Sequence, residues 1–494
     1  MRSTPAVSVR PALFVLAALA ALASCMKKDP DFCCSTQESC SRNGGPGVLT
    51  PCTDPERPFC DDDGQYGIGR TCIADPVSNP CETPAECTNP DRPVCLERHC
   101  VQCGASPDCD AASPVCDQGT HLCGSCEGND DCALRAGTPR CLVSTGACVA
   151  CLDGGDCAAA AAPVCDPGTH ECRACRADTE CASAVCDRDA GSCVAEASII
   201  YLSPSGAAAG TCTRASPCST FALGIAQVNA TRNVIKAAPG MYTGQVVLDG
   251  VTVSIFADGA TAQPSALNQS VVVVTNGADA TIKGLTVTGA GGATNPVGVQ
   301  CSPGAGGTPT LRLERSTVIA NAGGGVSISN CEFALVNNVV AGNGGPLLSS
   351  VGVTIAQISA ATGPLHDFSF NTVTSNVAVA NTTTGVECVQ IATPLAFANN
   401  IVYANQVAGT GTQVGGDADC SWSYSDIGPQ SAAGMGNLNM DPLFVDVAGR
   451  NFHLMGTSPA KNVADPTANL PVDIDLESRP QGGRSDMGAD EVLE

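Results

Sequence analysis

The chain has few aromatic residues and little positive charge, and both shortages limit what it can be. Aromatic residues make up 3% of its 494 residues, so an ordinary aromatic-rich core is excluded. The formal net charge is −24, and no Lys or Arg occurs between Ser316 and Gly449. Nucleic acids and anionic lipid surfaces are bound by clustered Lys and Arg. We therefore expect no nucleic-acid partner.

The sequence also lacks an apolar run long enough to cross a membrane, which takes about 20 residues. Its longest apolar run, Pro11–Ala23, follows Arg2 and Arg10 and is typical of a secretory signal peptide. The run ends in Leu22-Ala23-Ser24-Cys25, which resembles the bacterial lipobox. The resemblance implies removal of residues 1–24, lipid on Cys25, and a protein attached through that lipid to the outer membrane or cell surface of a Gram-negative bacterium. An ordinary signal peptide followed by an incidental cysteine is the alternative.

Cysteine is abundant, but unevenly placed. Of the 33 cysteines, 27 precede residue 194. Residues 25–80 form a cysteine-containing linker without a clear period. Residues 81–195 contain five sets of four cysteines, each opening with C-x5-C and joined to the next by C-x2-C. The sets are Cys81/Cys87/Cys95/Cys100, Cys103/Cys109/Cys116/Cys123, Cys126/Cys132/Cys141/Cys148, Cys151/Cys157/Cys165/Cys172 and Cys175/Cys181/Cys186/Cys193.

Two disulfides in each set would supply the stability that a unit of about 24 residues cannot gain from burial. Four cysteines can pair in three ways, and the sequence does not choose among them. Zinc bound by the C-x2-C pairs is the alternative, but thiolate ligands are not expected in an exported protein. Aspartates next to the cysteines suggest calcium or, more simply, turn caps. The spacing is similar to that of cysteine-rich modules in myxobacterial surface lipoproteins, which have been compared with the Dickkopf N-terminal domain.

The second half predicts an all-β fold built from short strands. Runs of Val, Ile and Thr alternate with Gly, Asn and Asp, as in strands separated by turns. Four segments share one form, with a polar residue first and Asn in the sixth position: Ser316–Asn321, Asn338–Asn343, Asn371–Asn376 and Asn400–Asn405. Such a repeat indicates coils stacked at about 4.8 Å, with asparagines at left-handed bends bonded to those of the next coil. Val and Ile would fill a narrow interior.

These features resemble the right-handed parallel β-helix, or pectate-lyase-like, superfamily. The resemblance implies a β-helix over residues 198–436, preceded by the region of small disulfide-rich repeats. Residues 437–494 are similar to the closing module of bacterial surface proteins known as choice-of-anchor Q, and we expect them to cap the last coil. The motifs that carry this similarity are Asp441-Pro-Leu-Phe444, Ser458-Pro-Ala460, Asp473-Ile-Asp475, Arg479-Pro480 and Asp486-Met-Gly-Ala-Asp-Glu491. Met487 departs from the usual Ile.

The six cysteines of this half are spaced for disulfides. Cys212 and Cys218 are close enough in sequence to close a short loop. The pairs Cys301/Cys331 and Cys388/Cys420 are each separated by about one coil plus an insertion.

Two kinds of catalytic site have candidate residues in this half. A lyase needs cations and a base, and Arg312 and Arg315 beside Glu314 are the best candidates; a solvated strand face is the simpler interpretation. A glycoside hydrolase needs two carboxylates, for which Asp417 and Asp419 are candidates, with Trp422 and Tyr424 to stack on a sugar. An irregular loop held by Cys420 is the alternative there.

Calcium is the one cofactor that the sequence suggests, with Asp473 and Asp475 as candidate ligands. Motifs familiar in pectate lyases and polygalacturonases are absent from the sequence. The sequence therefore favours a surface lipoprotein that displays a β-helix on a disulfide-rich stalk and binds a polysaccharide or another surface protein without catalysis. A polysaccharide lyase or glycoside hydrolase is the alternative.

Overall fold

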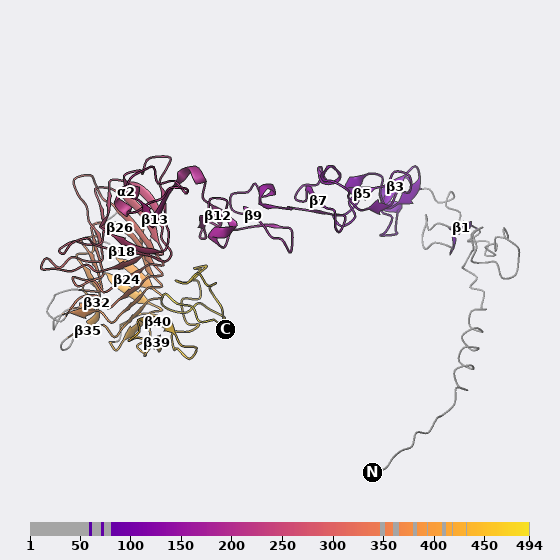
Figure 1. The fold of residues 1–494 in the computed structure, drawn as a ribbon. Helices are drawn as coiled ribbons and strands as arrows, with labels where there is room; N and C mark the ends of the chain where they lie inside the picture. Colours follow the sequence, from indigo (N-terminus) through magenta and orange to yellow (C-terminus); the bar gives the residue numbers. More distant parts are fainter. Residues whose placement is uncertain are drawn as a thin grey trace, which may run out of the picture. The chain divides into compact units, whose positions relative to one another are not determined.

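The computed structural model describes residues 59–61, 71–73, 81–345, 351–358, 365–378, 383–392, 394–407, 412–416, 418–430 and 432–493 (Figure 1). The chain divides into two compact units. The first contains the residues up to Cys175 together with 190–192, and the second contains 176–189 and 193–494. The predicted lipid attachment site, Cys25, lies outside the described residues.

Each cysteine set folds as a short 3-10 helix followed by a two-stranded antiparallel hairpin. An earlier hairpin joins β1 (Phe59–Asp61) and β2 (Thr71–Ile73). The 3-10 helices are η2 (Pro84–Glu86), η3 (Ser106–Asp108), η4 (Asn129–Cys132), η5 (Gly154–Asp156) and η6 (Asp178–Glu180). The hairpin strands are β3 (Val94–Leu96), β4 (His99–Val101), β5 (Val115–Cys116), β6 (Cys123–Gly124), β7 (Arg140–Leu142), β8 (Ala147–Val149), β9 (Val164–Cys165), β10 (Cys172–Arg173), β11 (Cys186–Asp187) and β12 (Ser192–Cys193).

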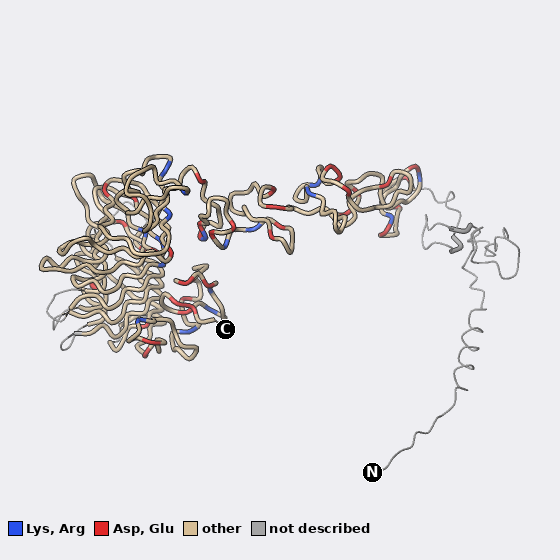
Figure 2. Tube along the Cα trace, viewed as in Figure 1, with Lys and Arg blue, Asp and Glu red and all other residues tan. Residues whose placement is uncertain are grey.

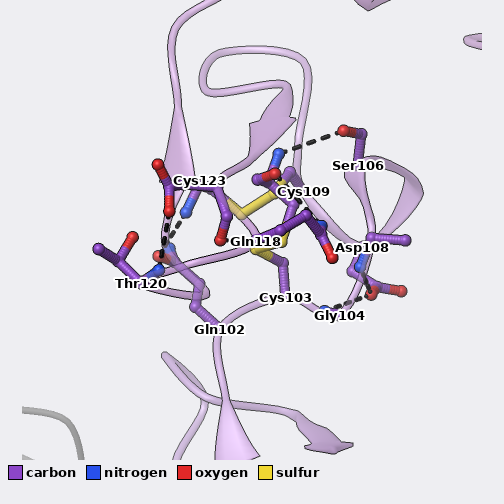
Figure 3. The surroundings of a disulfide bond; sticks show 12 residues. Gln102, Cys103, Gly104, Ser106, Asp108, Cys109, Gln118, Thr120 and Cys123 are labelled. Carbon is purple, nitrogen blue, oxygen red and sulfur yellow. Dashed lines mark hydrogen bonds between the residues drawn. A yellow bond between two sulfur atoms is a disulfide. The ribbon is translucent and has the colours of Figure 1, made fainter.

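The disulfides select one of the three possible pairings. In each of the first four sets the first cysteine bonds to the third and the second to the fourth, as in Cys103–Cys116 and Cys109–Cys123 (Figure 3). The fifth set contains Cys181–Cys193. Because these sulfur atoms are bonded to one another, they are not the thiolates that a zinc site requires.

Aspartates near the cysteines act as turn caps. The carboxylate of Asp108 accepts hydrogen bonds from the backbone N–H groups of Gly104 and Ala105 (Figure 3). Asp117 does the same for Gly119 and Thr120. These backbone bonds are the main reason why the pKa of Asp117 lies below its usual value. Such contacts favour the turn-cap interpretation of these aspartates over calcium binding.

The second unit contains a right-handed parallel β-helix of three sheets. It begins after η7 (Glu196–Ser198), and α2 (Phe221–Ile225) lies between its first two strands. The first sheet contains β13 (Ile199–Ala207), β14 (Val234–Ala237), β17 (Thr252–Phe256), β20 (Asp279–Lys283), β23 (Thr310–Glu314), β26 (Glu332–Val336), β29 (His366–Ser369), β33 (Leu395–Ala398) and β37 (Cys420–Ser423).

Each coil then adds one strand to a second sheet and one to a third. The second contains β15 (Gly240–Thr243), β18 (Ala260–Gln263), β21 (Thr286–Thr288), β24 (Thr317–Ile319), β27 (Val339–Ala341), β30 (Thr372–Thr374), β34 (Ile401–Tyr403) and β38 (Asp426–Gly428). The third contains β16 (Val246–Asp249), β19 (Val272–Thr275), β22 (Val299–Cys301), β25 (Val326–Ser329), β28 (Val353–Ala356), β32 (Thr383–Val389) and β36 (Thr412–Gly416). A short pair, β31 (Val377–Ala378) and β35 (Gln406–Val407), lies between these two sheets in the chain.

Three disulfides brace the β-helix. They join Cys212 to Cys218, Cys301 to Cys331, and Cys388 to Cys420.

Apolar side chains of equivalent strand positions stack inside the coils. In the first sheet Ile255, Ile282, Leu313 and Leu335 are in register and buried. In later coils the stack becomes aromatic: Phe368 and Phe397 have ring centroids 5.2 Å apart, and Phe397 and Trp422 are 5.1 Å apart. The scarce aromatic residues thus fill the interior of the last coils.

Two ladders of buried polar side chains run along the edges of the second sheet. The first contains Ser316, Asn338, Asn371, Asn400 and Ser425, and the second contains Asn321, Asn343, Asn376, Asn405 and Gln413. Each side-chain oxygen accepts a hydrogen bond from the backbone N–H of the preceding coil's equivalent, as Asn371 does from Asn338 at 3.1 Å. The asparagine amides also donate to backbone carbonyls, as Asn371 does to Leu335 at 2.7 Å.

The left-handed residue at each bend is the one before the ladder residue, not the ladder asparagine itself as the sequence suggested. Asn337 (φ 64°) precedes Asn338, and Phe370 (φ 55°) precedes Asn371. The left-handed residue bends the chain from one sheet to the next, and the following residue can then point its side chain inward along the stack.

The C-terminal residues do more than cap the last coil. Residues 432–440 pair with that coil: Ile427 N–H donates to the carbonyl of Leu438 at 2.9 Å. The following residues, including β39 (Phe444–Asp446) and β40 (Asn451–Leu454), lie against the outer face of the second sheet. There Ala489 N–H donates to Thr372 Oγ1 at 3.0 Å. The outward side chains of Val339, Ala341 and Ile401 are buried beneath these residues.

Replacement of Asn371 by alanine tests the ladders. The substitution removes the acceptor of the Asn338 N–H and the donor to the Leu335 carbonyl, so both buried groups lose their partner. We expect a loss of about 2–4 kcal/mol in the free energy of unfolding, measured by denaturant titration. Asn469→Ala at an exposed position is the control. Equal stability of the two variants would contradict a structural role for the ladder.

Candidate functional site

The fifth cysteine set contributes residues 176–189 to the second unit, and these lie on the outer face of the first sheet. Lys236 Nζ lies 2.6 Å from Asp178. Lys283 Nζ lies 3.1 Å from Asp187 and also pairs with Asp189. Arg315 pairs with Asp189 at 2.9 Å. Three cations on these early coils thus face carboxylates from one short segment.

Both candidate lyase arginines form ion pairs within the chain. The Arg315 side chain is 8% exposed and is bound to Asp189 through two nitrogens. Arg312 lies on the strand face and pairs with Asp279 at 2.6 Å. Glu314, the candidate base, lies 3.6 Å from Lys283, and burial raises its pKa. The structure therefore gives the two arginines different carboxylate partners.

Of the candidate hydrolase pair near Cys420, the structure describes Asp419 alone. Asp417 lies outside the described residues and Asp419 is exposed, so their pairing stays a prediction. Asp419 lies in the turn directly before β37, which begins at the disulfide-bonded Cys420. Trp422 packs in the aromatic stack and is 8% exposed, so its ring is not available to a sugar. Tyr424 lies against the Arg484 guanidinium.

Asp426 is fully buried on the outer side of the last coil, in register with Ile401 and beneath the C-terminal residues. One carboxylate oxygen accepts a hydrogen bond from Met440 N–H at 3.0 Å, and the other has no partner among the described residues. Burial raises the pKa of Asp426 to about 7. Asp426 is therefore a buried carboxyl group bonded to the capping residues.

The candidate calcium ligands are already hydrogen-bonded. Asp473 is buried, and its two oxygens accept from the backbone N–H groups of Asp475, Glu477 and Glu491. Asp475 binds His453 at 2.7 Å. These contacts engage the carboxylate oxygens that calcium would need.

A cleft of about 350 Å³ lies between the second sheet and the C-terminal residues. Its lining combines apolar and charged side chains, among them Arg315, Arg450, Phe452, His453 and Asp490. Burial raises the pKa of Asp490 to about 6, and the Asp475 hydrogen bond raises that of His453 to about 9. This cleft is the one place among those described where shifted acid and base groups share a cavity.

A second cavity, a groove of about 530 Å³, crosses the outer face of the third sheet. No charged residue lines it. Its lining residues are Gln245, Asn268, Gln269, Ser270, Val273, Thr294, Asn295, Pro296, Val297, Gln300 and Ser327. This groove could not be predicted from the sequence, since amide and hydroxyl side chains are common in turns. Charged residues are sparse along the coils as a whole (Figure 2).

We compared the chain with family models, curated proteins and solved structures. No family model and no curated protein matches the chain. Among solved structures it is similar to "Crystal structure of pectate lyase Pel9A", with 13% identity, a TM-score of 0.25, and coverage of 59% of this chain and 96% of that chain. A score this low supports no inference about activity, and the fold assignment rests on the three parallel sheets themselves. Within the described ranges, no helix is long and apolar enough to cross a membrane.

The raised pKa of His453 predicts a pH dependence. The protonated ring donates to Asp475 and Asn451, so its contribution to stability is full below the unfolded-state pKa of 6.5 and disappears as pH rises through about 9. We expect His453→Gln to lower the thermal midpoint at about pH 6 and to have no effect at about pH 10. His170→Gln, in a cysteine repeat, is the control. A His453→Gln effect that is the same at both pH values would contradict the assignment.

Proposed function

We propose that this protein is exported and lipid-anchored at the surface of a Gram-negative bacterium, where it displays a β-helix on a disulfide-rich stalk. The β-helix binds a glycan or another surface protein and performs no catalysis. The pattern Leu22–Cys25 supports the lipid anchor, and the many disulfides support an oxidising compartment. The lipid makes the membrane a partner, and the acidic chain is a poor match to nucleic acid.

One observation carries the non-catalytic assignment. Three of the cations that a lyase would need for a uronate, Lys236, Lys283 and Arg315, are neutralised within the chain by Asp178, Asp187 and Asp189. The fourth, Arg312, pairs with Asp279. Lys283 and Arg315 are each at least nine-tenths buried in these pairs. A polyanionic substrate would have to displace three carboxylates to reach them.

A carbohydrate-active enzyme remains the second candidate, and the cleft beside the C-terminal residues favours it. Asp475 and Asp490 both line that cleft, and the pKa of Asp490 lies near 6. Glycoside hydrolysis uses two carboxyl groups, one of which has a raised pKa.

Incubation of the full chain with plant, algal and bacterial polysaccharides, with and without calcium, distinguishes the two. We expect no unsaturated uronates and no new reducing ends, but retention of the protein on at least one insoluble glycan or on intact cells. Asp490→Asn, with Asp465→Asn as the control, tests the cleft in the same assay.

Turnover by the full chain would overturn the proposal, and its loss in Asp490→Asn alone would place the reaction in the cleft. Turnover lost only when Arg312 and Arg315 are both replaced would place it on the first sheet instead.

A further inference from the structure

The groove on the third sheet is built from three successive coils and two loops. Its floor comes from outward residues of β19, β22 and β25, in the register Val273, Gln300 and Ser327. Residues 268–270 and 294–297, which follow β18 and β21 in the chain, form its walls. Outward residues of adjacent strands are about 4.8 Å apart, so the groove presents one side chain per coil.

Hydrogen bonds fix several of its polar groups. Ser270 Oγ donates to Gln300 Oε1 at 3.2 Å, and Gln245 Nε2 donates to the Ser270 carbonyl at 2.8 Å. Asn268 Oδ1 accepts from the Thr294 backbone N–H at 3.0 Å. These contacts tie the two loops to the strands, so the groove keeps its shape without a ligand.

Two amides keep unused hydrogen-bonding capacity. Gln269 Oε1 is buried and has no partner among the described residues. Gln300 accepts from Ser270, but its Nε2 donates to no described side chain or carbonyl. A buried polar oxygen without a partner is costly. Because this oxygen is shielded from solvent, a hydroxyl donor in the groove reaches it when the Gln269 side chain turns toward the groove that the residue lines.

The lining also determines what is rejected. A uronate or phosphate entering the groove would lose water without gaining a cation, because no Lys or Arg lines it. Amides both donate and accept, which suits the hydroxyl groups of a sugar. Val273, Pro296 and Val297 supply apolar surface for the C–H face of a sugar ring.

We propose that this groove binds an uncharged, hydroxyl-rich glycan that lies across successive coils, with Gln269 and Gln300 as its main contacts. The inference rests on the proposed binding function and names its site and ligand class. Beyond Ser327 the same outward row continues with Thr354 on β28 and then Glu387 on β32, so a chain longer than the groove meets one further hydroxyl group before a carboxyl group.

The test is titration calorimetry of the full chain with hexasaccharides of neutral glucan, mannan, xylan and galactan, and with oligogalacturonate. We expect at least one neutral hexasaccharide to bind, with an affinity that changes less than about twofold between low and high salt, since no ion pair forms. Gln300→Leu and Gln269→Leu should each weaken binding by at least about tenfold. Gln263→Leu, which changes an outward glutamine of the second sheet, should leave it unchanged.

The thermal midpoint of each variant accompanies the titrations, and Gln269→Leu is expected to fold normally because it removes an unpartnered oxygen. Binding of oligogalacturonate alone, weakened by salt and unaffected by Gln300→Leu, would overturn this inference and leave the proposed function standing. Neutral binding that survives both groove variants would overturn it as well. Absence of binding to every glycan, with retention on intact cells, would reject the glycan site while supporting a protein partner.

Discussion

Stacking of one coil on the next is the constraint on which the rest of this structure depends. A coil of the β-helix has no core of its own, and each buried asparagine of the two ladders bonds to the coils before and after it. On the coils that contain the ladders, these bonds fix which residues point inward and which point outward. The outward rows of the three sheets then become the surfaces from which any function must be built.

The three outer faces differ in what lies on them. The first sheet is covered in its early coils by residues 176–189, whose aspartates pair with Lys236, Lys283 and Arg315. The C-terminal residues pack on the second sheet through an apolar cluster that includes Ile401, Phe452 and Met487. The third sheet carries the uncharged groove. Three positive charges on the coils are therefore paired within the chain, and the face proposed to bind a ligand is lined by uncharged residues.

The sequence predicted the local features well and the long-range contacts poorly. Cysteine spacing, runs of Val and Ile, and the six-residue asparagine pattern each report on neighbouring residues or on the next coil, and they were sufficient for the fold. The partners of Lys283 are 94 and 96 residues away in the sequence, and no local pattern reveals them. The sequence suggests that Trp422 stacks on a sugar ring, but strand alternation in β37 turns its ring into the core beside Phe397.

The acidic segment of the fifth cysteine set, residues 176–189, occupies the cationic face of the first sheet. Zero-length carbodiimide cross-linking followed by mass spectrometry tests this placement most directly. We expect isopeptide bonds that join Lys283 to Asp187 or Asp189, and Lys236 to Asp178, because these groups are in contact. Full labelling of Lys283 and Lys236 by an added amine-reactive reagent, with no such cross-links, would contradict it and would return these cations to the candidates for binding an acidic polysaccharide.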